Sequence, residues 1–302
     1  MHTFEGAADS FHARQQRMNG AHAPAPPTEA SVVARGSSFN AAMRILPRPR
    51  RKAMFEIYAF CRAVDDIADA SAPRLARQQA LKEWRRDIAA LYNQPPAESC
   101  EKEKLRGLSS AIQTFGLRQE DFQSVIDGME MDVVADIRAP DLATLDLYCD
   151  RVASAVGRLS ARAFGMPEAE GVGLAHHLGR ALQFTNILRD LDEDGAIGRL
   201  YLPREDLNAV AIVGTDPEVA LASPSLPAAC APTIARAKFH FREAARVMAR
   251  CPRWSVRAPR VMADVYRAIL GRLEARGFAP PRPRISTPRL RVLLAILRYG
   301  IV

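Results

Sequence analysis

Aromatic side chains are scarce in this chain of 302 residues: they make up 7% of the sequence, and no basic stretch is interleaved with them. Proteins that bind single-stranded nucleic acid stack bases on aromatic side chains within a basic groove, so the sequence gives nucleic-acid binding little support. The chain nevertheless carries a formal charge of +8, with arginine supplying most of the excess. Such a balance favours anionic partners, which leaves acidic lipids and phosphorylated small molecules as the better-supported classes.

The five cysteines form no CxxC pair and have no spacing typical of zinc sites. An odd number of cysteines without a signal sequence predicts reduced thiols in the cytoplasm. No segment approaches the roughly 20 apolar residues of a membrane span, and the N-terminus has no apolar core of a signal peptide. We therefore expect a cytoplasmic protein that is soluble or peripheral to the inner face of the membrane.

Strand-like alternation is also missing, and helical periodicity dominates instead. In residues 51–70, Met54, Ile57, Cys61 and Val64 recur at spacings of three and four. Glycine and proline separate the helical segments, which we expect over about 51–70, 75–92, 103–115, 119–137, 142–165, 168–192, 229–250, 258–277 and 286–298. The sequence therefore predicts an all-α fold.

No linker divides the chain after its first residues, so we expect one helical domain over 35–285. Residues 1–34 are rich in proline and alanine and have almost no bulky apolar pattern, which predicts a disordered leader. Residues 286–302 form a basic amphipathic C-terminal helix, and this helix either rests on anionic lipid or docks on its own domain.

A first acidic motif lies in residues 58–69, which read YAFCRAVDDIAD. On a helix of 3.6 residues per turn, Tyr58, Arg62, Asp65 and Asp69 share one face, with the two carboxylates one turn apart. Like charges at this spacing repel each other, and a bound cation would offset the repulsion. Considered alone, this motif is better explained as a solvated acidic face.

A second acidic motif follows in residues 183–194, which read QFTNILRDLDED. Gln183, Asn186, Asp190 and Asp194 again fall on one helical face, and apolar residues stand between them. Oxygen ligands of this kind suit Mg²⁺, which combines one or two carboxylates with substrate phosphates. Two such helices facing each other could hold several magnesium ions around diphosphate groups, and the pair favours a functional site over a solvated surface.

Arginines accompany both acidic motifs. Arg62 and Arg189 lie within them, while Arg199 and Tyr201 follow in the short basic loop 195–203. A guanidinium binds phosphate oxygens through two hydrogen bonds and stabilises a departing diphosphate. The loop suits a flap over a bound substrate, although an ordinary helix connection explains it equally well.

At these residues the chain resembles the squalene/phytoene synthase family of head-to-head prenyl synthases, over about residues 36–280. Besides the two acidic motifs, the resemblance rests on the segments 37–39, 46–47 and 148–157. It implies an isoprenoid-synthase-type helical bundle around a central cavity. It also implies that Mg²⁺, with Mn²⁺ as an alternative, binds with the substrate diphosphates to Asp65, Asp69, Asn186, Asp190 and Asp194.

The same resemblance implies contacts with the prenyl diphosphate substrates by Ser38, Phe39, Tyr58, Arg62, Gln183, Arg189, Arg199 and Tyr201. It places Tyr148 in the cavity, where its hydroxyl would steer the carbocation or accept its proton; a buried core tyrosine is the alternative. The small residues Ala153, Ala155, Gly157 and Ala161 are candidates for a wall that leaves room for prenyl tails, or else for close helix packing.

Within the family, the segments 37–47, 60–69, 126–132 and 277–284 are most similar to bacterial members of hopanoid pathways. This similarity implies condensation of two farnesyl diphosphates to presqualene diphosphate, without NADPH, and downstream enzymes of the squalene pathway are candidate partners. The alternatives are a phytoene synthase that uses geranylgeranyl diphosphate and a squalene synthase that completes an NADPH-dependent reduction. A terpene cyclase and a non-enzymatic basic scaffold are the competing classes.

Overall fold

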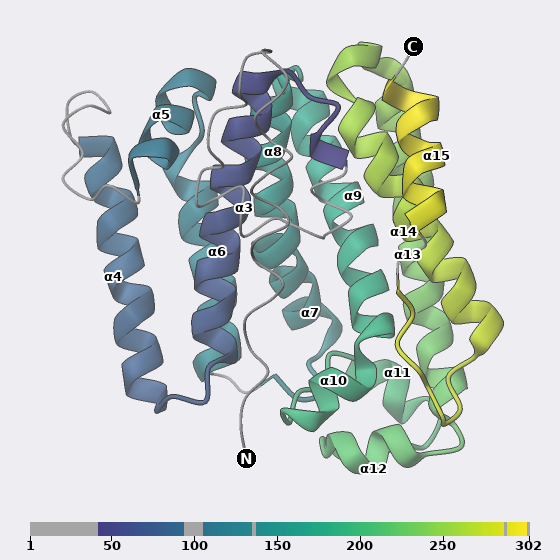
Figure 1. The fold of residues 1–302 in the computed structure, drawn as a ribbon. Helices are drawn as coiled ribbons and strands as arrows, with labels where there is room; N and C mark the ends of the chain where they lie inside the picture. The colour runs from purple at the N-terminus through teal and green to yellow at the C-terminus, as the bar shows by residue number, and fades with distance from the viewer. Residues whose placement is uncertain (1–41, 94–104, 135–136, 287–288, 301–302) are drawn as a thin grey trace, which may run out of the picture.

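The computed structural model describes residues 42–93, 105–134, 137–286 and 289–300, and within these ranges every regular element is helical (Figure 1). The β-type pairing in the described part is an isolated parallel bridge between Arg138 and Leu200. Long helices stand side by side, and short helices gather at one end of the bundle (Figure 1). The predicted all-α fold is confirmed.

Six helices of 16 residues or more build the bundle: α3 (Arg48–Asp69), α4 (Arg74–Asn93), α6 (Gln119–Val134), α9 (Glu168–Arg189), α13 (Leu226–Arg250) and α14 (Arg257–Arg276). The shorter α-helices are α5 (Arg106–Phe115), α7 (Leu142–Cys149), α8 (Ala155–Phe164), α10 (Leu191–Ala196), α11 (Arg204–Asn208), α12 (Pro217–Ala222) and α15 (Arg289–Gly300). A π-helical segment, η3 (Asp150–Ser154), and a 3-10 turn, η4 (Arg253–Ser255), complete the list. The periodicity of the sequence did not predict α11 and α12, which have only five and six residues.

The core forms where the apolar stripes of the helices meet. On α3 the stripe includes Ile57, Phe60 and Val64, each at most 2% exposed. The Phe60 ring makes edge contacts with Trp84 of α4 and Phe122 of α6, with centroids 5.5 and 5.1 Å apart. Burial of each such side chain stabilises the fold by about 1.5–3 kcal/mol, so this stripe fixes which face of α3 is left for the acidic motif.

The region predicted as one helix over 142–165 is instead α7, η3 and α8 in succession, with a π-helical turn in the middle. Gly179 of α9 lies against this turn: a Cβ added there would be 2.9 Å from the carbonyl carbon of Ala153. No real side chain tolerates such a contact, so the glycine permits the close approach of α9. π-turns of this kind are often found at functional sites.

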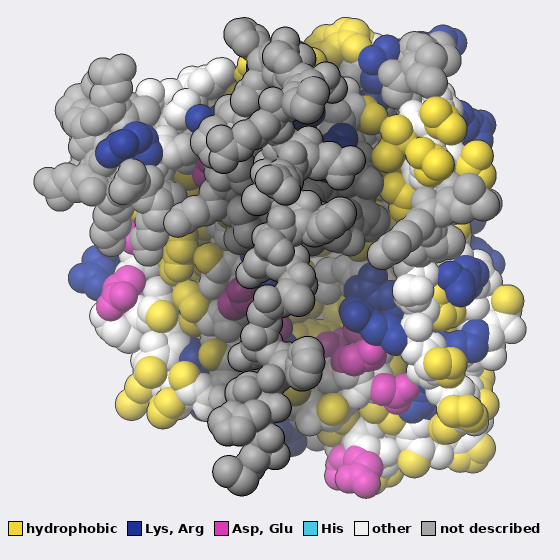
Figure 2. Space-filling model, in the orientation of Figure 1, with side chains coloured by type: hydrophobic (Ala, Val, Ile, Leu, Met, Phe, Trp, Pro, Cys, Tyr) yellow, Lys and Arg dark blue, Asp and Glu magenta, His cyan; other side chains and the backbone are white. Residues whose placement is uncertain are grey.

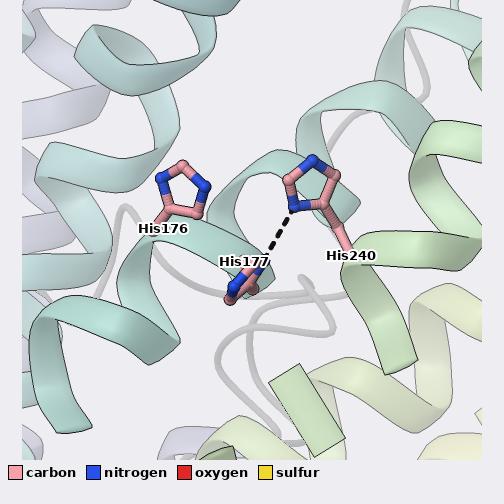
Figure 3. Close-up of side chains that lie close together, drawn as sticks. All are labelled: His176, His177 and His240. Carbon is pink, nitrogen blue, oxygen red and sulfur yellow. Dashed lines mark hydrogen bonds between the residues drawn. The ribbon is translucent and has the colours of Figure 1, made fainter. Parts of the chain in front are cut away.

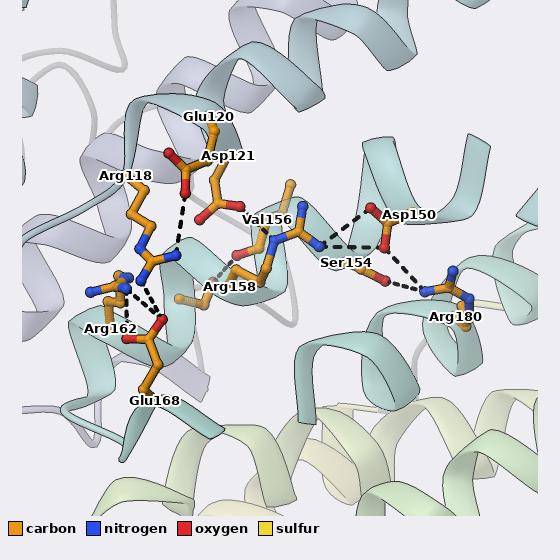
Figure 4. A network of polar contacts seen from close by, with 11 residues as sticks. Arg118, Glu120, Asp121, Asp150, Ser154, Val156, Arg158, Arg162, Glu168 and Arg180 are labelled. Carbon is orange, nitrogen blue, oxygen red and sulfur yellow. Dashed lines mark hydrogen bonds and ion pairs between the residues drawn. The ribbon is translucent and has the colours of Figure 1, made fainter. Parts of the chain in front are cut away.

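Ion pairs made by two arginines hold the π-turn to its neighbours (Figure 4). Arg180 of α9 is 3% exposed and donates to both carboxylate oxygens of Asp146 at 2.7 and 2.9 Å and to Ser154 at 2.8 Å. Arg158 of α8 donates to Asp121 of α6 at 2.5 Å and to Asp150 at 3.3 Å. Together these bonds fix η3 between α6 and α9.

The C-terminal helix α15 packs against α14. Val292 and Ala295 of α15 are buried, and the Tyr299 hydroxyl donates to Asp264 of α14 at 2.8 Å. Leu293, Leu294 and Leu297 are about half exposed on the outer side of α15. Within the described residues, no helix combines the length and the apolar character that crossing a membrane requires.

Candidate active site

The two acidic motifs meet at one end of the bundle, where α3 ends and α9 passes into α10 (Figure 1). Arg199, which follows α10, joins them. Its guanidinium donates to the Asp69 carboxylate at 2.6 Å and to the Ala68 carbonyl at 3.0 Å, and its side chain is 11% exposed. The segment after the second motif is therefore bonded directly to the first motif, across 130 positions of sequence.

The predicted continuous helix through the second motif is wrong at Asp190. α9 ends at Arg189, Asp190 has φ −102° and ψ 19°, and the chain becomes helical again in α10. The Asp190 amide donates to the Asn186 carbonyl, and the Asp194 amide donates to the Asp190 carbonyl, both at 2.8 Å. The chain therefore stays coiled through a bend, and Asp194 does not lie on a straight continuation of the face that carries Asn186.

Asp132 of α6 is a buried carboxylate between the motifs. The hydroxyl of Tyr201 donates to one of its oxygens at 2.7 Å and the hydroxyl of Tyr148 to the other at 3.0 Å, and the two tyrosine rings stack 5.0 Å apart. Burial raises the pKa of Asp132, while nearby Arg199 and the two hydroxyl groups act against the rise. Burial and the neighbouring Asp132 also raise the pKa of Tyr148 well above its usual range, so this phenol stays protonated.

Carboxylates of both motifs influence each other's ionisation. Burial, and then repulsion from Asp69, raises the pKa of Asp65 to about 6. Burial, and then repulsion from Asp190, raises the pKa of Asp194 to about 7, with Asp132 and Asp69 adding to the rise and Arg199 opposing it. The site therefore concentrates negative charge that a divalent cation would offset.

The donor atoms suit magnesium. The Oδ1 atom of Asn186 is buried and has no hydrogen-bond partner among the described residues. An unsatisfied buried oxygen of this kind costs about 1–3 kcal/mol, and coordination to a cation would satisfy it. An amide oxygen beside crowded carboxylates is an oxygen-only ligand set, which Mg²⁺ prefers.

Arginines surround the acidic residues, and one face of the molecule has acidic and basic side chains next to each other where α9, α10 and the segment before α15 meet (Figure 2). Arg62 pairs with Asp65 at 3.2 Å and with Asp66 at 2.7 Å. Arg189 holds both oxygens of Asp190, at 2.8 and 2.5 Å. Arg62, Arg189 and Arg199 each contact a carboxylate that is a predicted metal ligand.

The sequence reasoning missed three charged residues of this site: Asp132, Arg282 and Arg284. Arg284 approaches Asp190 at 3.0 Å, and Arg282, which is 6% exposed, pairs with Asp192 at 2.5 Å. Arg282 and Arg284 lie in a proline-rich segment without helical periodicity, so the sequence did not indicate their partners. Asp132 did have a detectable signal, because it stands three residues after Met129, on the apolar face of its helix.

Of the remaining predicted substrate-binding residues, two lie on the helices that carry the acidic motifs and two lie outside the described residues. Tyr58 and Gln183 are half-buried on α3 and α9. Ser38 and Phe39 lie outside the described residues, as does the leader 1–34.

An apolar cavity opens between α3, η3, α8, α9 and α14, and its lining includes Met54, Ala153, Gly157, Ala161, Leu182 and Met262. Ala155, by contrast, is fully buried in the core. Leu182 precedes Asn186 by one helical turn, and Met54 precedes Tyr58 by one turn. Both helices therefore run from the apolar cavity to the acidic cluster.

Residues 32–291 match the squalene/phytoene synthase family. The chain belongs to this family, in agreement with the resemblance of its motifs. The fold agrees as well: a crystal structure of a dehydrosqualene synthase has a TM-score of 0.74 at 25% identity and matches 89% of this chain and 93% of its own. A squalene synthase from Alicyclobacillus acidocaldarius has a TM-score of 0.71 at 28% identity and covers 80% of this chain and 89% of its own.

Among relatives in the family, a presqualene diphosphate synthase from Rhodopseudomonas palustris is 58% identical over 93% of this chain and 99% of its own length. A protein of the same name from Zymomonas mobilis is 49% identical over 91% of this chain and 93% of its own length. A 15-cis-phytoene synthase from Synechocystis is only 29% identical over 83% of this chain and 76% of its own length. The similarity is thus much higher to the presqualene diphosphate synthases.

Proposed function

We propose that the chain is a prenyltransferase that condenses two farnesyl diphosphates to presqualene diphosphate and releases one diphosphate, in squalene or hopanoid biosynthesis. The observation that carries this proposal is the acidic cluster of two motifs at the end of an apolar cavity. The high identity to relatives named presqualene diphosphate synthase supports the choice of product over phytoene.

Asp65, Asp69, Asn186, Asp190 and Asp194 would hold Mg²⁺ or, as a substitute, Mn²⁺. Bound there, the metal supplies the positive charge that stabilises a departing diphosphate. Arg62, Arg189 and Arg199 lie at the same cluster, and their guanidinium groups would bind the phosphate oxygens that face away from the carboxylates. In this proposal each of these arginines is paired with a carboxylate in the free protein and pairs with a substrate phosphate instead when the substrate binds.

The substrate's prenyl chains would occupy the apolar cavity, and bound there they would keep water from the allylic cation. Tyr58 and Gln183 would contact the substrates from α3 and α9, and Ser38 and Phe39 from the segment before α3. Tyr148 and Tyr201 donate hydrogen bonds to the Asp132 carboxylate, and the Tyr148 hydroxyl is proposed to steer the carbocation or to accept its proton. NADPH has no role in the proposed reaction.

The protein is further proposed to be cytoplasmic and to touch the inner face of the membrane through α15. The half-exposed leucines of α15 lie on the same helix as Arg298, which lines a basic pocket with Arg253, Arg257 and Arg260. Apolar and basic side chains side by side suit an anionic lipid surface. Residues 35–285 would then be the catalytic domain, with 1–34 as a dispensable leader.

Mass spectrometry of the products tests the proposal. Purified protein is incubated with farnesyl diphosphate and Mg²⁺, with and without NADPH, and separately with geranylgeranyl diphosphate. We expect presqualene diphosphate in both farnesyl reactions. Squalene formed only with NADPH would identify a complete squalene synthase, phytoene would identify the longer-chain enzyme, and a cyclic C15 product would identify a terpene cyclase.

A further inference from the structure

Three of the six histidines of the chain come together between α9 and α13 (Figure 3). His176 and His177 belong to α9, and His240 belongs to α13. One ring nitrogen from each histidine lies within 4.8 Å of the other two. The Nδ1 atoms of His177 and His240 are 3.0 Å apart, and Figure 3 shows the hydrogen bond that joins these two rings.

This spacing is close to that of a metal site. With metal–nitrogen bonds of about 2.0–2.1 Å in a tetrahedral arrangement, two ligand nitrogens lie about 3.3–3.4 Å apart. The His177–His240 pair would need to open by about 0.3 Å, and the exposed His176 would need to approach by at most about 1.5 Å, which a side-chain rotation supplies.

The surroundings keep the three imidazoles in the neutral form that binds metal. Burial lowers the pKa of His240 to about 4, and it lowers the pKa values of His176 and His177 as well. The positive charge of nearby Arg180 also favours the neutral imidazoles, and Asp146, which accepts two hydrogen bonds from Arg180, opposes this influence at His176 and His240.

A hydrogen bond between two neutral histidines would by itself explain the contact of His177 with His240. It does not explain the third ring: His176 makes an edge contact with His177 at 4.7 Å between centroids and lies 5.7 Å from His240. The outer side of the cluster is open, because His176 is exposed.

We propose that His176, His177 and His240 bind one transition-metal ion of the Zn²⁺ class, which joins α9 to α13 and keeps a water or another solvent ligand in the open position. This site is separate from the acidic cluster. His177 and Asn186 are nine residues apart on α9, or about 14 Å along the helix axis. Nitrogen ligands select borderline metals, whereas the oxygen ligands of the acidic cluster select Mg²⁺.

A Zn²⁺ titration of the full chain in excess Mg²⁺ tests the proposal, because Mg²⁺ would occupy the proposed carboxylate site. We expect one Zn²⁺ per chain with a dissociation constant in the micromolar range or below, a tetrahedral absorption spectrum when Co²⁺ replaces Zn²⁺, and a rise in Tm with Zn²⁺. His177→Ala and His240→Ala should each weaken binding by about tenfold or more and remove the rise in Tm.

A control and a third cluster variant complete the test. The triple change of His2, His12 and His22 to alanine removes the other histidines of the chain and should leave Zn²⁺ binding unchanged. The exposed His176→Ala variant preserves the packed ring pair and should still weaken binding, so the test does not depend on a variant that fails to fold. Absence of binding by the full chain, or equal binding by wild type and all three cluster variants, would overturn the proposal.

Discussion

Replacing Asp194 by asparagine should stabilise the metal-free protein above neutral pH, although Asp194 is a proposed metal ligand. Burial and the neighbouring Asp190, Asp132 and Asp69 raise its pKa from 3.8 to about 7. Between these two values the folded state binds more protons than the unfolded state, so stability falls as the pH rises through this window. Above pH 7 the folded protein carries the full cost of the ionised carboxylate, and asparagine removes it.

The size of the effect follows from the same pKa values. A rise from 3.8 to about 7 corresponds to roughly 4 kcal/mol at about 1.36 kcal/mol per pH unit. Asp194 is half-buried and solvent screens part of the repulsion, so we expect about 1–2 kcal/mol. For a protein of this size that corresponds to a rise in Tm of a few degrees.

Thermal unfolding with EDTA at pH 8 and at pH 5 measures the prediction, with Asp192→Asn as the matched control on the same helix. Asp192 pairs with the buried guanidinium of Arg282, so its replacement should destabilise the fold by about 1–3 kcal/mol. Saturating Mg²⁺ should reverse the order of wild type and Asp194→Asn, because only the wild type keeps the full ligand set. The electrostatic reasoning is refuted if Asp194→Asn lowers the Tm at pH 8, or raises it equally at pH 5.

Three other predictions concern activity, packing and the C-terminal helix. Asp190→Asn should reduce turnover by orders of magnitude at saturating Mg²⁺ while circular dichroism stays unchanged; retained activity would contradict the proposed ligand set. Arg180→Met removes the buried guanidinium that pairs with the exposed Asp146 and, beside Arg158, with the part-exposed Asp150, and should lower the free energy of unfolding by about 1–3 kcal/mol in urea titrations. A loss below about 1 kcal/mol is typical of an exposed ion pair and would mean that the network does not hold η3. Removal of residues 289–302 should abolish salt-sensitive binding to anionic vesicles while activity in detergent survives; a drop in Tm without any vesicle binding by the intact chain would assign α15 to docking alone.

Local features of the site could be predicted from the sequence, because helical periodicity places Arg62, Asp65 and Asp69 on one face without knowledge of the rest of the fold. The bend at Asp190 could not be predicted, since i-to-i+4 hydrogen bonding continues on both sides of it and the apolar pattern is not interrupted. The π-turn could not be predicted either, because no glycine or proline lies within Asp150–Ser154 or directly beside it to mark a change in the helix.

Contacts between segments that are distant in the sequence could not be predicted for a different reason. Arg284 donates a hydrogen bond to Asp190, which lies 94 positions earlier in the sequence, and no pattern in either segment indicates that they are in contact. Asp132 could have been found, because a carboxylate on an apolar helical face must be paired when buried. Its partners, Tyr148 and Tyr201, become apparent only when α6, α7 and the loop before α11 are packed together.

The ratio of diphosphate released to farnesyl diphosphate consumed tests the central claim most directly. Condensation that stops at presqualene diphosphate retains one diphosphate in the product, so purified protein with Mg²⁺ and farnesyl diphosphate should release one diphosphate for every two substrates consumed. Complete conversion to a hydrocarbon, or cyclisation of a single substrate, releases one diphosphate for every substrate. A ratio of one to two, unchanged by NADPH, is the result we predict, and a ratio of one to one would contradict the account.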